Sequence, residues 1–436
     1  MTWRLPTLAA IGAILVATTL AGPMVHRGLG DMAFAALAIG QGLMVLLALR
    51  LALRCPARPA LAVIAAVAVA LRLALLPVAP HLSTDAYRYV WDGRVQAAGI
   101  NPYRHIPEDP ALAALRDEAI YPNINRRDVA VTIYPPGAQL LFLGVAGLGG
   151  GLTAMRLALL GCEAVVVAVL LAMLARFGLP STRVLAYAWH PLAVWEIAGS
   201  GHVDAAMLAL VMLGLWVGVV AGRRVAGAAL LAVATLVKPF ALLCLPAVWR
   251  PWDWRAPAAA VAVAVLLYLP YLSVGAGVLG YLPDYLAEER IEDGEGFWAV
   301  AALQTLFGPL PWSRPLYLAA SVMLIGGLAL ALPFAARRDP RPEVVLRRLF
   351  WLLFAFLALL SSNWPWYNLL LLPFVALFGP VPAWVATIGG FILYDEVWAD
   401  FDIGPLLRES LLNLAVLASL ALSARRAVIL REPLRA

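Results

Sequence analysis

The sequence has very little charge. Charged residues make up 13% of its 436 residues, whereas hydrophobic residues make up 63%. Soluble globular domains usually carry about 25% charged residues, so this chain has too few charges to cover its apolar surface in water. Its composition therefore excludes a soluble enzyme, a nucleic-acid binder and a secreted disulfide scaffold.

Cysteine and lysine are also scarce. The three cysteines, Cys55, Cys162 and Cys244, lie far apart in apolar sequence and lack the spacing of a metal or redox site. We interpret them as small core residues. Lys238 is the only lysine, although arginine is common. Base composition can explain that scarcity, so only the position of this one lysine needs a functional explanation.

Long apolar runs are what the sequence does contain. Mean hydropathy is +0.86, and the runs have the length of roughly 20 residues that crosses a bilayer. Because they are continuous rather than alternating, a membrane β-barrel is excluded. We predict one integral membrane domain over residues 1–436, an all-α polytopic transmembrane bundle of about 12–14 spans. The expected spans lie near residues 5–22, 32–53, 60–79, 155–175, 182–198, 203–221, 225–237, 239–249, 256–274, 316–335, 346–362, 366–379, 381–394 and 406–424.

Basic residues gather in alternate loops between these runs. With the N-terminus inside, the loops on that side hold 19 basic and 4 acidic residues, and the opposite loops hold 11 basic and 21 acidic residues. This distribution follows the positive-inside rule. We therefore predict a cell (inner) membrane protein with both termini in the cytoplasm. The polar sequence then faces the extracytoplasmic side, in residues 80–136, 196–204, 275–300 and 395–409.

The first outer loop, residues 80–136, is the most polar segment, with 13 charged residues among 57. Ser83 and Thr84 are typical helix caps, and the sequence after them predicts a helix from Asp85 to about Ala98. On such a helix Asp85, Arg88 and Asp92 share one face. Tyr87 and Trp91 would form an aromatic edge beside that face, suited to a membrane surface or to a sugar.

Asp85 follows a predicted span closely and should lie near the membrane boundary. A carboxylate beside apolar walls can be tuned as a general base. Two alternatives stay open from the residues alone. Asp85 can be an acid favoured by the helix dipole, or half of a surface pair with Arg88.

The sequence resembles the polytopic glycosyltransferase C superfamily in STDAYRYVWDGRVQAAGINPYRH, in IYPPGAQ and in the later segments AWHPLAVWEIAGSGHVDA, LVKPF and NWPWYN. It is most similar to bacterial polyprenyl-phosphate-mannose-dependent mannosyltransferases of the phosphatidylinositol-mannoside group. The likeness spans most of residues 80–373. In that superfamily a catalytic Asp lies in the first large external loop, and Asp85 holds the matching place. Many members carry this loop after the first span, whereas here it follows the third expected one.

This resemblance implies a transferase that moves a sugar, most simply mannose, from a polyprenyl-phosphate donor to a lipid or glycan acceptor, with inversion. Asp85 would be the catalytic residue. Alternatives are another polyprenyl-phosphate sugar, such as glucose or aminoarabinose, a flippase or transporter of lipid-linked sugars, and a non-catalytic scaffold. A transporter built on inverted repeats is less favoured because the two halves show no clear relation. We expect no metal and no cofactor.

Lys238 stands in apolar sequence directly before Pro239. A cation near the membrane centre costs about 3 kcal/mol, and a proline can divide a span into two half-helices. An ammonium at such a break is well placed to bind the donor phosphate. The alternative is that Lys238 extends to the lipid headgroups.

Glu196, His202 and Asp204 interrupt a second apolar region. The glycines before His202 would turn it outward, and Asp204 could orient its ring. We assign His202, together with Arg88, to the donor phosphate. Asp92, Tyr87 and Asp204 are assigned to the sugar or acceptor.

Trp364, Trp366 and Tyr367 surround a proline at a predicted outer membrane face. Aromatic residues commonly form an interfacial belt there, but three around one proline also suit a sugar face or a polyprenyl chain. We therefore add all three to the sugar and acceptor site. The acidic stretch at residues 288–295 invites a divalent-metal interpretation, although a solvated loop explains it more simply.

Overall fold

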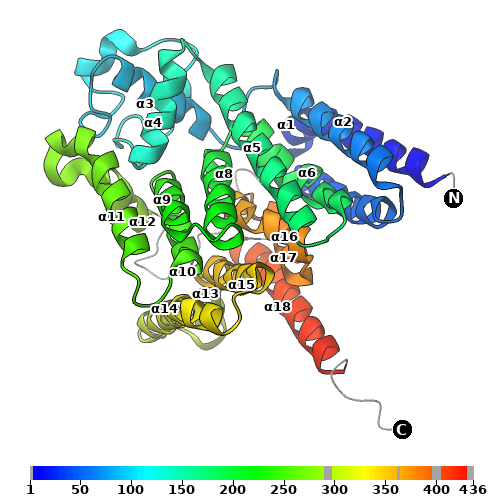
Figure 1. The fold of residues 1–436 in the computed structure, drawn as a ribbon. Coiled ribbons are helices and arrows are strands. Elements are labelled where there is room, and N and C mark those ends of the chain that lie inside the picture. The colour runs from blue at the N-terminus through cyan, green and yellow to red at the C-terminus, as the bar shows by residue number, and fades with distance from the viewer. Residues whose placement is uncertain (1–2, 289–296, 361–363, 395–403, 430–436) are drawn as a thin grey trace, which may run out of the picture.

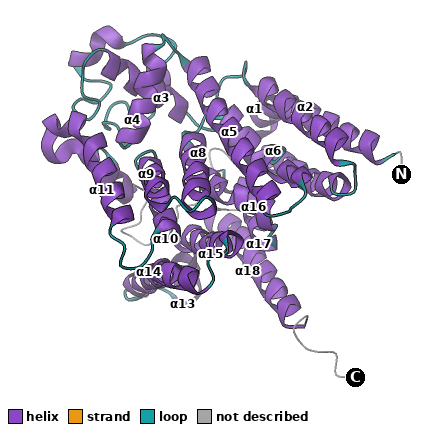
Figure 2. Cartoon of the chain, viewed as in Figure 1, coloured by secondary structure: helices purple, strands orange, loops and turns teal. Residues whose placement is uncertain are grey.

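The computed structural model describes residues 3–288, 297–360, 364–394 and 404–429. Within these ranges the regular structure is entirely helical, without a strand (Figure 2). The predicted all-α class is thereby confirmed. Two stretches named above, 289–295 of the acidic segment and 395–403 of the last outer segment, lie outside the described residues.

Several helices are long and apolar enough to cross a membrane, so the chain is a multi-pass membrane protein. The first is α1, Arg4–Ala52, and the second is α2, Ala57–Leu75. The six candidate spans among the described residues are Arg4–Ala52, Ala57–Leu75, Leu152–Arg176 (α5), Arg255–Tyr285 (α11, Arg255–Tyr268, with the turns after it), Ser313–Arg338 (α14) and Leu406–Arg425 (within α18, Pro405–Ile429).

α1 contains the first two expected spans. Gly30 has a φ of 78° and interrupts its helical backbone, which glycine tolerates better than other residues. At the far ends, the Arg4 guanidinium donates a hydrogen bond to the Arg54 carbonyl at 3.2 Å. The two halves of α1 therefore run back along one another, with the break at Gly30 on the opposite side from Arg4.

The other expected spans consist of α15 (Pro342–Leu360), which is as long as α2, and of shorter helical pieces. Many begin with proline, which has no backbone N–H to lose at the start of a helix but cannot continue one. The pieces are η3 Ser181–Val184, α6 Leu185–Ala188, α7 Pro191–Ala193, η4 Val194–Gly199, α8 Asp204–Leu215, η5 Trp216–Val220, α9 Arg224–Thr235, η6 Pro239–Cys244, α10 Leu245–Val248, α15 Pro342–Leu360, η8 Pro365–Leu371, α16 Leu372–Phe378, α17 Val381–Gly389 and η9 Gly390–Leu393.

The first outer loop forms its own layer at one end of the bundle (Figure 1). It contains α3, Asp85–Ala97, and leads through η1, Pro110–Leu115, and η2, Tyr121–Asn123, into α4, Pro136–Gly147. Gly93 of α3 lies against the backbone of α4, where any side chain would collide with it. α3 is therefore packed closely on α4 rather than exposed. The remaining described helices are η7 Leu269–Leu279, α12 Leu282–Glu288 and α13 Trp298–Phe307.

Arg156 of α5 joins two segments that carry functional candidates. Its buried guanidinium donates hydrogen bonds to the carbonyls of Leu75 and Leu76, at 2.8 and 3.0 Å, and of Val78 at 2.7 Å. It also donates to the Ala198 carbonyl in η4. Buried carbonyls need such partners, so Arg156 fixes the end of α2, just before Asp85, against the segment that leads to His202.

Candidate active site

Asp85 is the first residue of α3, as the sequence predicts. Its backbone N–H donates to the Ser83 hydroxyl at 3.2 Å, whereas the Thr84 side chain makes no capping bond. The Asp85 carboxylate accepts a hydrogen bond from the Asn125 amide at 2.8 Å and keeps 24% of its side chain exposed. The helix start therefore holds Asp85 at an edge that a substrate can reach.

Two tyrosines stand near Asp85. Burial raises the pKa of Tyr134 well above its usual value, and the negative charge of Asp85 adds to the increase. The pKa of Tyr89 is raised by the same two causes in the same order. Both hydroxyls therefore stay protonated at neutral pH, as neutral groups beside the Asp85 carboxylate. The Tyr89 hydroxyl also accepts the backbone N–H of Val203 at 3.3 Å, which connects α3 to the residues before α8.

His202 lies between two carboxylates. Its Nδ1 is 3.8 Å from Asp85 Oδ2, and its Nε2 is 3.3 Å from Glu196 Oε2. His202 is 1% exposed and Glu196 is fully buried. The Tyr394 hydroxyl donates to the other Glu196 oxygen. The sequence predicted Asp204 as the partner of His202, but Glu196 takes that place.

Asp204 instead binds Lys238. The Lys238 ammonium donates to both Asp204 carboxylate oxygens, at 2.8 and 2.7 Å, and lies 4.6 Å from the centre of the Tyr367 ring. Lys238 follows α9 and precedes Pro239 at the start of η6, so the predicted break at this proline is confirmed. The backbone of Lys238 is extended, with φ −150° and ψ 126°, and directs its side chain toward the first residue of α8.

Aromatic rings connect these two pairs. Trp366 stacks on the His202 ring at 4.6 Å between centroids, and Trp364 stacks on Trp366 at 4.7 Å. The Tyr367 ring lies 5.9 Å from that of Trp366. Asp85, Glu196, His202, Asp204, Lys238 and the three aromatic residues thus form one cluster, which we call the central site.

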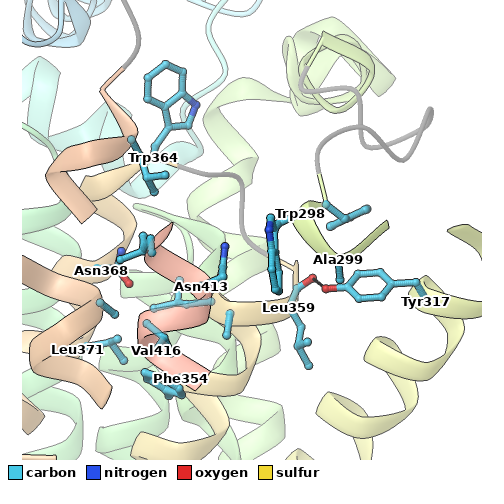
Figure 3. Close-up of a pocket in the computed structure, with 16 residues that line it drawn as sticks. Trp298, Ala299, Tyr317, Phe354, Leu359, Trp364, Asn368, Leu371, Asn413 and Val416 are labelled. Atoms are coloured by element: carbon cyan, nitrogen blue, oxygen red, sulfur yellow. Dashed lines mark hydrogen bonds between the residues drawn. The ribbon is translucent and has the colours of Figure 1, made fainter. Parts of the chain in front are cut away.

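A pocket lined by apolar and aromatic residues together with Asn368 and Asn413 opens beside the central site (Figure 3). Trp364 lies on its wall, and its empty volume is about 750 Å³ including the opening. Trp298 and Asn413 face it from α13 and α18, and Leu359 from α15. Trp364 thus belongs both to the wall of the pocket and to the stack that reaches His202 through Trp366.

Arg88, Asp92 and Tyr87 do not join the central site. The Arg88 guanidinium donates to Asp92 at 2.8 Å and to the Ala130 carbonyl at 3.1 Å, and Asp92 also accepts from Gln139 at 3.0 Å. Tyr87 is 8% exposed and packs in the core. These contacts do not support the expected phosphate and sugar roles of the three residues. The predicted aromatic edge at Tyr87 and Trp91 is wrong, because both rings are buried.

Asp85 and Glu196 face opposite nitrogens of the His202 ring, so the three residues cannot surround one ion together. No group of three or more His, Cys, Asp or Glu residues has a metal-binding arrangement in the described part of the chain. Asn125, Glu196 and Tyr394 are the neighbours that the predicted site omitted. Only Glu196 carried a signal, as an acid in apolar sequence.

A family model described as "Alpha-(1->6)-mannopyranosyltransferase, N-terminal domain" matches residues 6–253, more than half of the chain. The chain belongs to this family, the MptA_B family. It is therefore a glycosyltransferase of a mannosyltransferase family, and the resemblance to mannosyltransferases of the glycosyltransferase C superfamily is confirmed. Comparisons with curated proteins and with solved structures give no match.

The region matched by the mannosyltransferase family contains the charged part of the central site. Asp85, His202 and Lys238 all lie within residues 6–253, whereas Trp364 and Trp366 lie beyond them. A mannosyltransferase needs a sugar donor and an acceptor. The central site brings together a reachable carboxylate and cationic or titratable nitrogens, which are the groups that glycosyl transfer requires.

Proposed function

We propose that this mannosyltransferase transfers mannose from a polyprenyl-phosphate donor to a lipid or glycan acceptor on the extracytoplasmic side of the cell membrane, with inversion at the anomeric carbon. The observation that carries the proposal is the approach of Asp85 to His202, with Lys238 joined to the same cluster through Trp366 and Tyr367. Residues 1–436 act as one integral membrane domain, and residues 80–136 are its catalytic loop.

Asp85 is the general base in this proposal. Asn125 holds one carboxylate oxygen at 2.8 Å, and the carboxylate is open enough to receive an acceptor hydroxyl. As the acceptor oxygen forms its bond to the anomeric carbon, Asp85 removes its proton. The bond from that carbon to the phosphate oxygen breaks on the opposite face, which inverts the anomeric centre.

Lys238 and His202 stabilise the departing phosphate. Two N–H groups of the Lys238 ammonium point to Asp204, and a further N–H remains for a phosphate oxygen. The pair with Asp204 fixes the ammonium in place, and fixed charges aimed at developing charge contribute most to catalysis. Arg88 is not included, because its guanidinium is occupied by Asp92 and Ala130.

The pocket beside Trp364 supports a lipid-linked donor. Most of the residues that line it are apolar or aromatic, so in this proposal a polyprenyl chain lies along it, and the Trp364–Trp366 stack connects it to the central site.

Two contacts support the proposed orientation. Arg4 meets Arg54 at one end of α1, and the His26 ring lies 5.2 Å from the His81 ring near its break. Residues 26 and 81 therefore share one side, and residues 4 and 54 share the other. By the positive-inside rule the arginine-rich side, with both termini, is cytoplasmic, which leaves Asp85 outside.

Purified protein in liposomes, supplied with labelled polyprenyl-phosphate mannose and a lipid extract from its host, tests the donor. We expect a labelled lipid or glycan whose anomeric configuration is opposite to that of the donor. Polyprenyl-phosphate glucose and a nucleotide-linked mannose are the matched alternatives. Transfer from the nucleotide-linked sugar alone would contradict the proposal. Transfer of glucose alone would contradict the assignment of mannose but keep the polyprenyl-phosphate donor.

A further inference from the structure

The buried end of the central site contains the carboxylate of Glu196, which no substrate can reach. Glu196 is fully buried in η4, whereas Asp85, on the other side of His202, is partly exposed. The Tyr394 hydroxyl occupies one Glu196 oxygen. The other oxygen and His202 Nε2 have no hydrogen-bond partner among the described residues, although they lie only 3.3 Å apart. Burial of such a charge is costly unless it is paired.

The His202 ring cannot turn freely between the two carboxylates. Trp366 covers one of its faces in a stack with an angle of 22° between the rings. The His202 backbone N–H donates to the Glu196 carbonyl at 3.0 Å, so the two residues also share one turn of backbone. Gly201, with φ of 73°, lies against the Arg156 side chain, and Arg156 anchors this turn to the end of α2.

We infer that Glu196 is a positioning residue that keeps the proton of neutral His202 on Nε2, so that Nδ1 faces Asp85 as a proton acceptor. A neutral imidazole carries its single N–H on the nitrogen that meets an acceptor. A buried carboxylate can fix a histidine tautomer and stabilise the imidazolium that forms later. The inference rests on the proposed role of Asp85 as the general base.

The proton then follows a defined path. Asp85 takes it from the acceptor hydroxyl while the new bond to the anomeric carbon forms and the leaving phosphate oxygen keeps the electron pair of the broken bond. Asp85 passes the proton to His202 Nδ1 and becomes a carboxylate again. The imidazolium is then held between the Glu196 and Asp85 carboxylates, and its positive charge favours the departing phosphate at longer range. After the products leave, the proton returns through the exposed Asp85 to water.

Other charged groups near His202 are already engaged. Lys238 is paired with Asp204, and Arg156 is held by backbone carbonyls. The titratable and charged groups that face His202 or its two carboxylates are Asp85 and Tyr89 from α3, Tyr134 before α4, Arg126 in the first outer loop, Arg156 from α5, Asp204 from α8, Lys238 before η6 and Tyr394 after η9.

Glu196→Gln tests the inference, because glutamine keeps the shape and still accepts from Tyr394 but lacks the negative charge. We expect kcat to fall about 100-fold or more, with the donor KM nearly unchanged. The acidic limb of the pH–kcat profile should move to lower pH. Without the negative charge of Glu196 the His202 imidazolium is less stable, so a lower pH is needed to protonate the ring. Tyr394→Phe, which keeps the Glu196 charge, should lower kcat less and leave the limb in place.

A control variant separates this role from a structural one. Glu163→Gln removes another buried carboxylate, which lies on α5 outside the central site. The Glu163 carboxylate pairs with Arg72 of α2 at 2.6 Å. The substitution should reduce thermal stability without moving the pH profile. The same outcome for Glu196→Gln would overturn the inference. A raised donor KM with unchanged kcat would overturn it too, because Glu196 would then act in donor binding and not on the proton of His202.

A spectroscopic measurement does not depend on activity. With ¹⁵N-labelled histidine, the neutral His202 ring should show its proton on Nε2 in the native protein and lose that preference in Glu196→Gln. A proton on Nδ1 in the native protein would overturn the inference. If Asp85→Asn stayed active, the proposed function itself would fail. If Asp85→Asn were inactive while Glu196→Gln behaved as the native protein, only this inference would fail.

Discussion

His202 Nδ1 lies 3.8 Å from Asp85 Oδ2, although the two residues belong to segments far apart in the chain. Two contacts join these segments: Arg156 binds carbonyls at the end of α2 and in η4, and the Tyr89 hydroxyl of α3 accepts the Val203 N–H. The Arg156 guanidinium therefore helps to hold the proposed base near the imidazole.

Arg156→Met should separate the two segments. The carbonyls of Leu76, Val78 and Ala198 would lose the Arg156 donor, and leaving such groups unpaired costs on the order of 1–3 kcal/mol each before relaxation. We expect a lower melting temperature and a large loss of kcat. Thermal unfolding in detergent and transfer assays check this prediction, and a variant with native stability and native kcat would refute it.

Lys238→Met should impair the use of the donor and also destabilise the fold, because it leaves Asp204 buried without its cation. Adding Asp204→Asn removes that unpaired charge. We expect the double variant to regain much of its thermal stability while its donor kcat/KM stays low. Recovery of kcat/KM together with stability would show that Lys238 only neutralises Asp204.

Trp366→Leu should loosen the His202 ring and the entrance to the pocket. A stacked aromatic pair contributes about 1 kcal/mol beyond its buried area, and Trp366 makes two such stacks. If both stacks support the reacting arrangement, their loss of about 2 kcal/mol lowers kcat by roughly thirtyfold. Trp312→Leu, at an exposed tryptophan that the pocket does not include, is the control and should keep native kinetics.

Protonation of His81 should lower the free energy of unfolding in mild acid. Burial, followed by the charge of His26, lowers the pKa of His81 from 6.5 to about 4. Between these values the unfolded chain binds more protons than the folded one, so the free energy of unfolding decreases as pH falls from 6.5 toward 4. His81→Phe should flatten this dependence. Melting temperatures at pH 7 and pH 5 measure it, and an equal decrease in both proteins would refute the prediction.

The sequence predicted those parts of the central site that depend only on residues close together in the chain. Asp85 is found at a helix start, and Lys238 at the break made by Pro239, because capping and proline geometry are properties of a few neighbouring residues. His202 and Glu196 stood out because charged or titratable groups are costly in apolar spans. The apolar sequence around these two residues marked them as unusual, but it did not predict which side chain each one contacts.

The partners depended on contacts between distant segments. Glu196 meets Tyr394, and Lys238 meets Asp204, across pairs of helices that no local pattern relates. Arg88 was expected at the phosphate, but an acid lay one helical turn away and bound it. Tyr87 was expected to be exposed, yet it is buried in the hydrophobic core with Trp91.

The most direct test of the central claim is the transfer rate of Asp85→Asn in liposomes with labelled polyprenyl-phosphate mannose. Asparagine keeps the shape and the bond from Asn125 but cannot accept the acceptor proton. The control is Asp128→Asn, at an exposed acid in the same loop. We predict that Asp85→Asn folds and loses activity by about 100-fold or more, while Asp128→Asn keeps it. Native turnover by a well-folded Asp85→Asn protein would contradict the account.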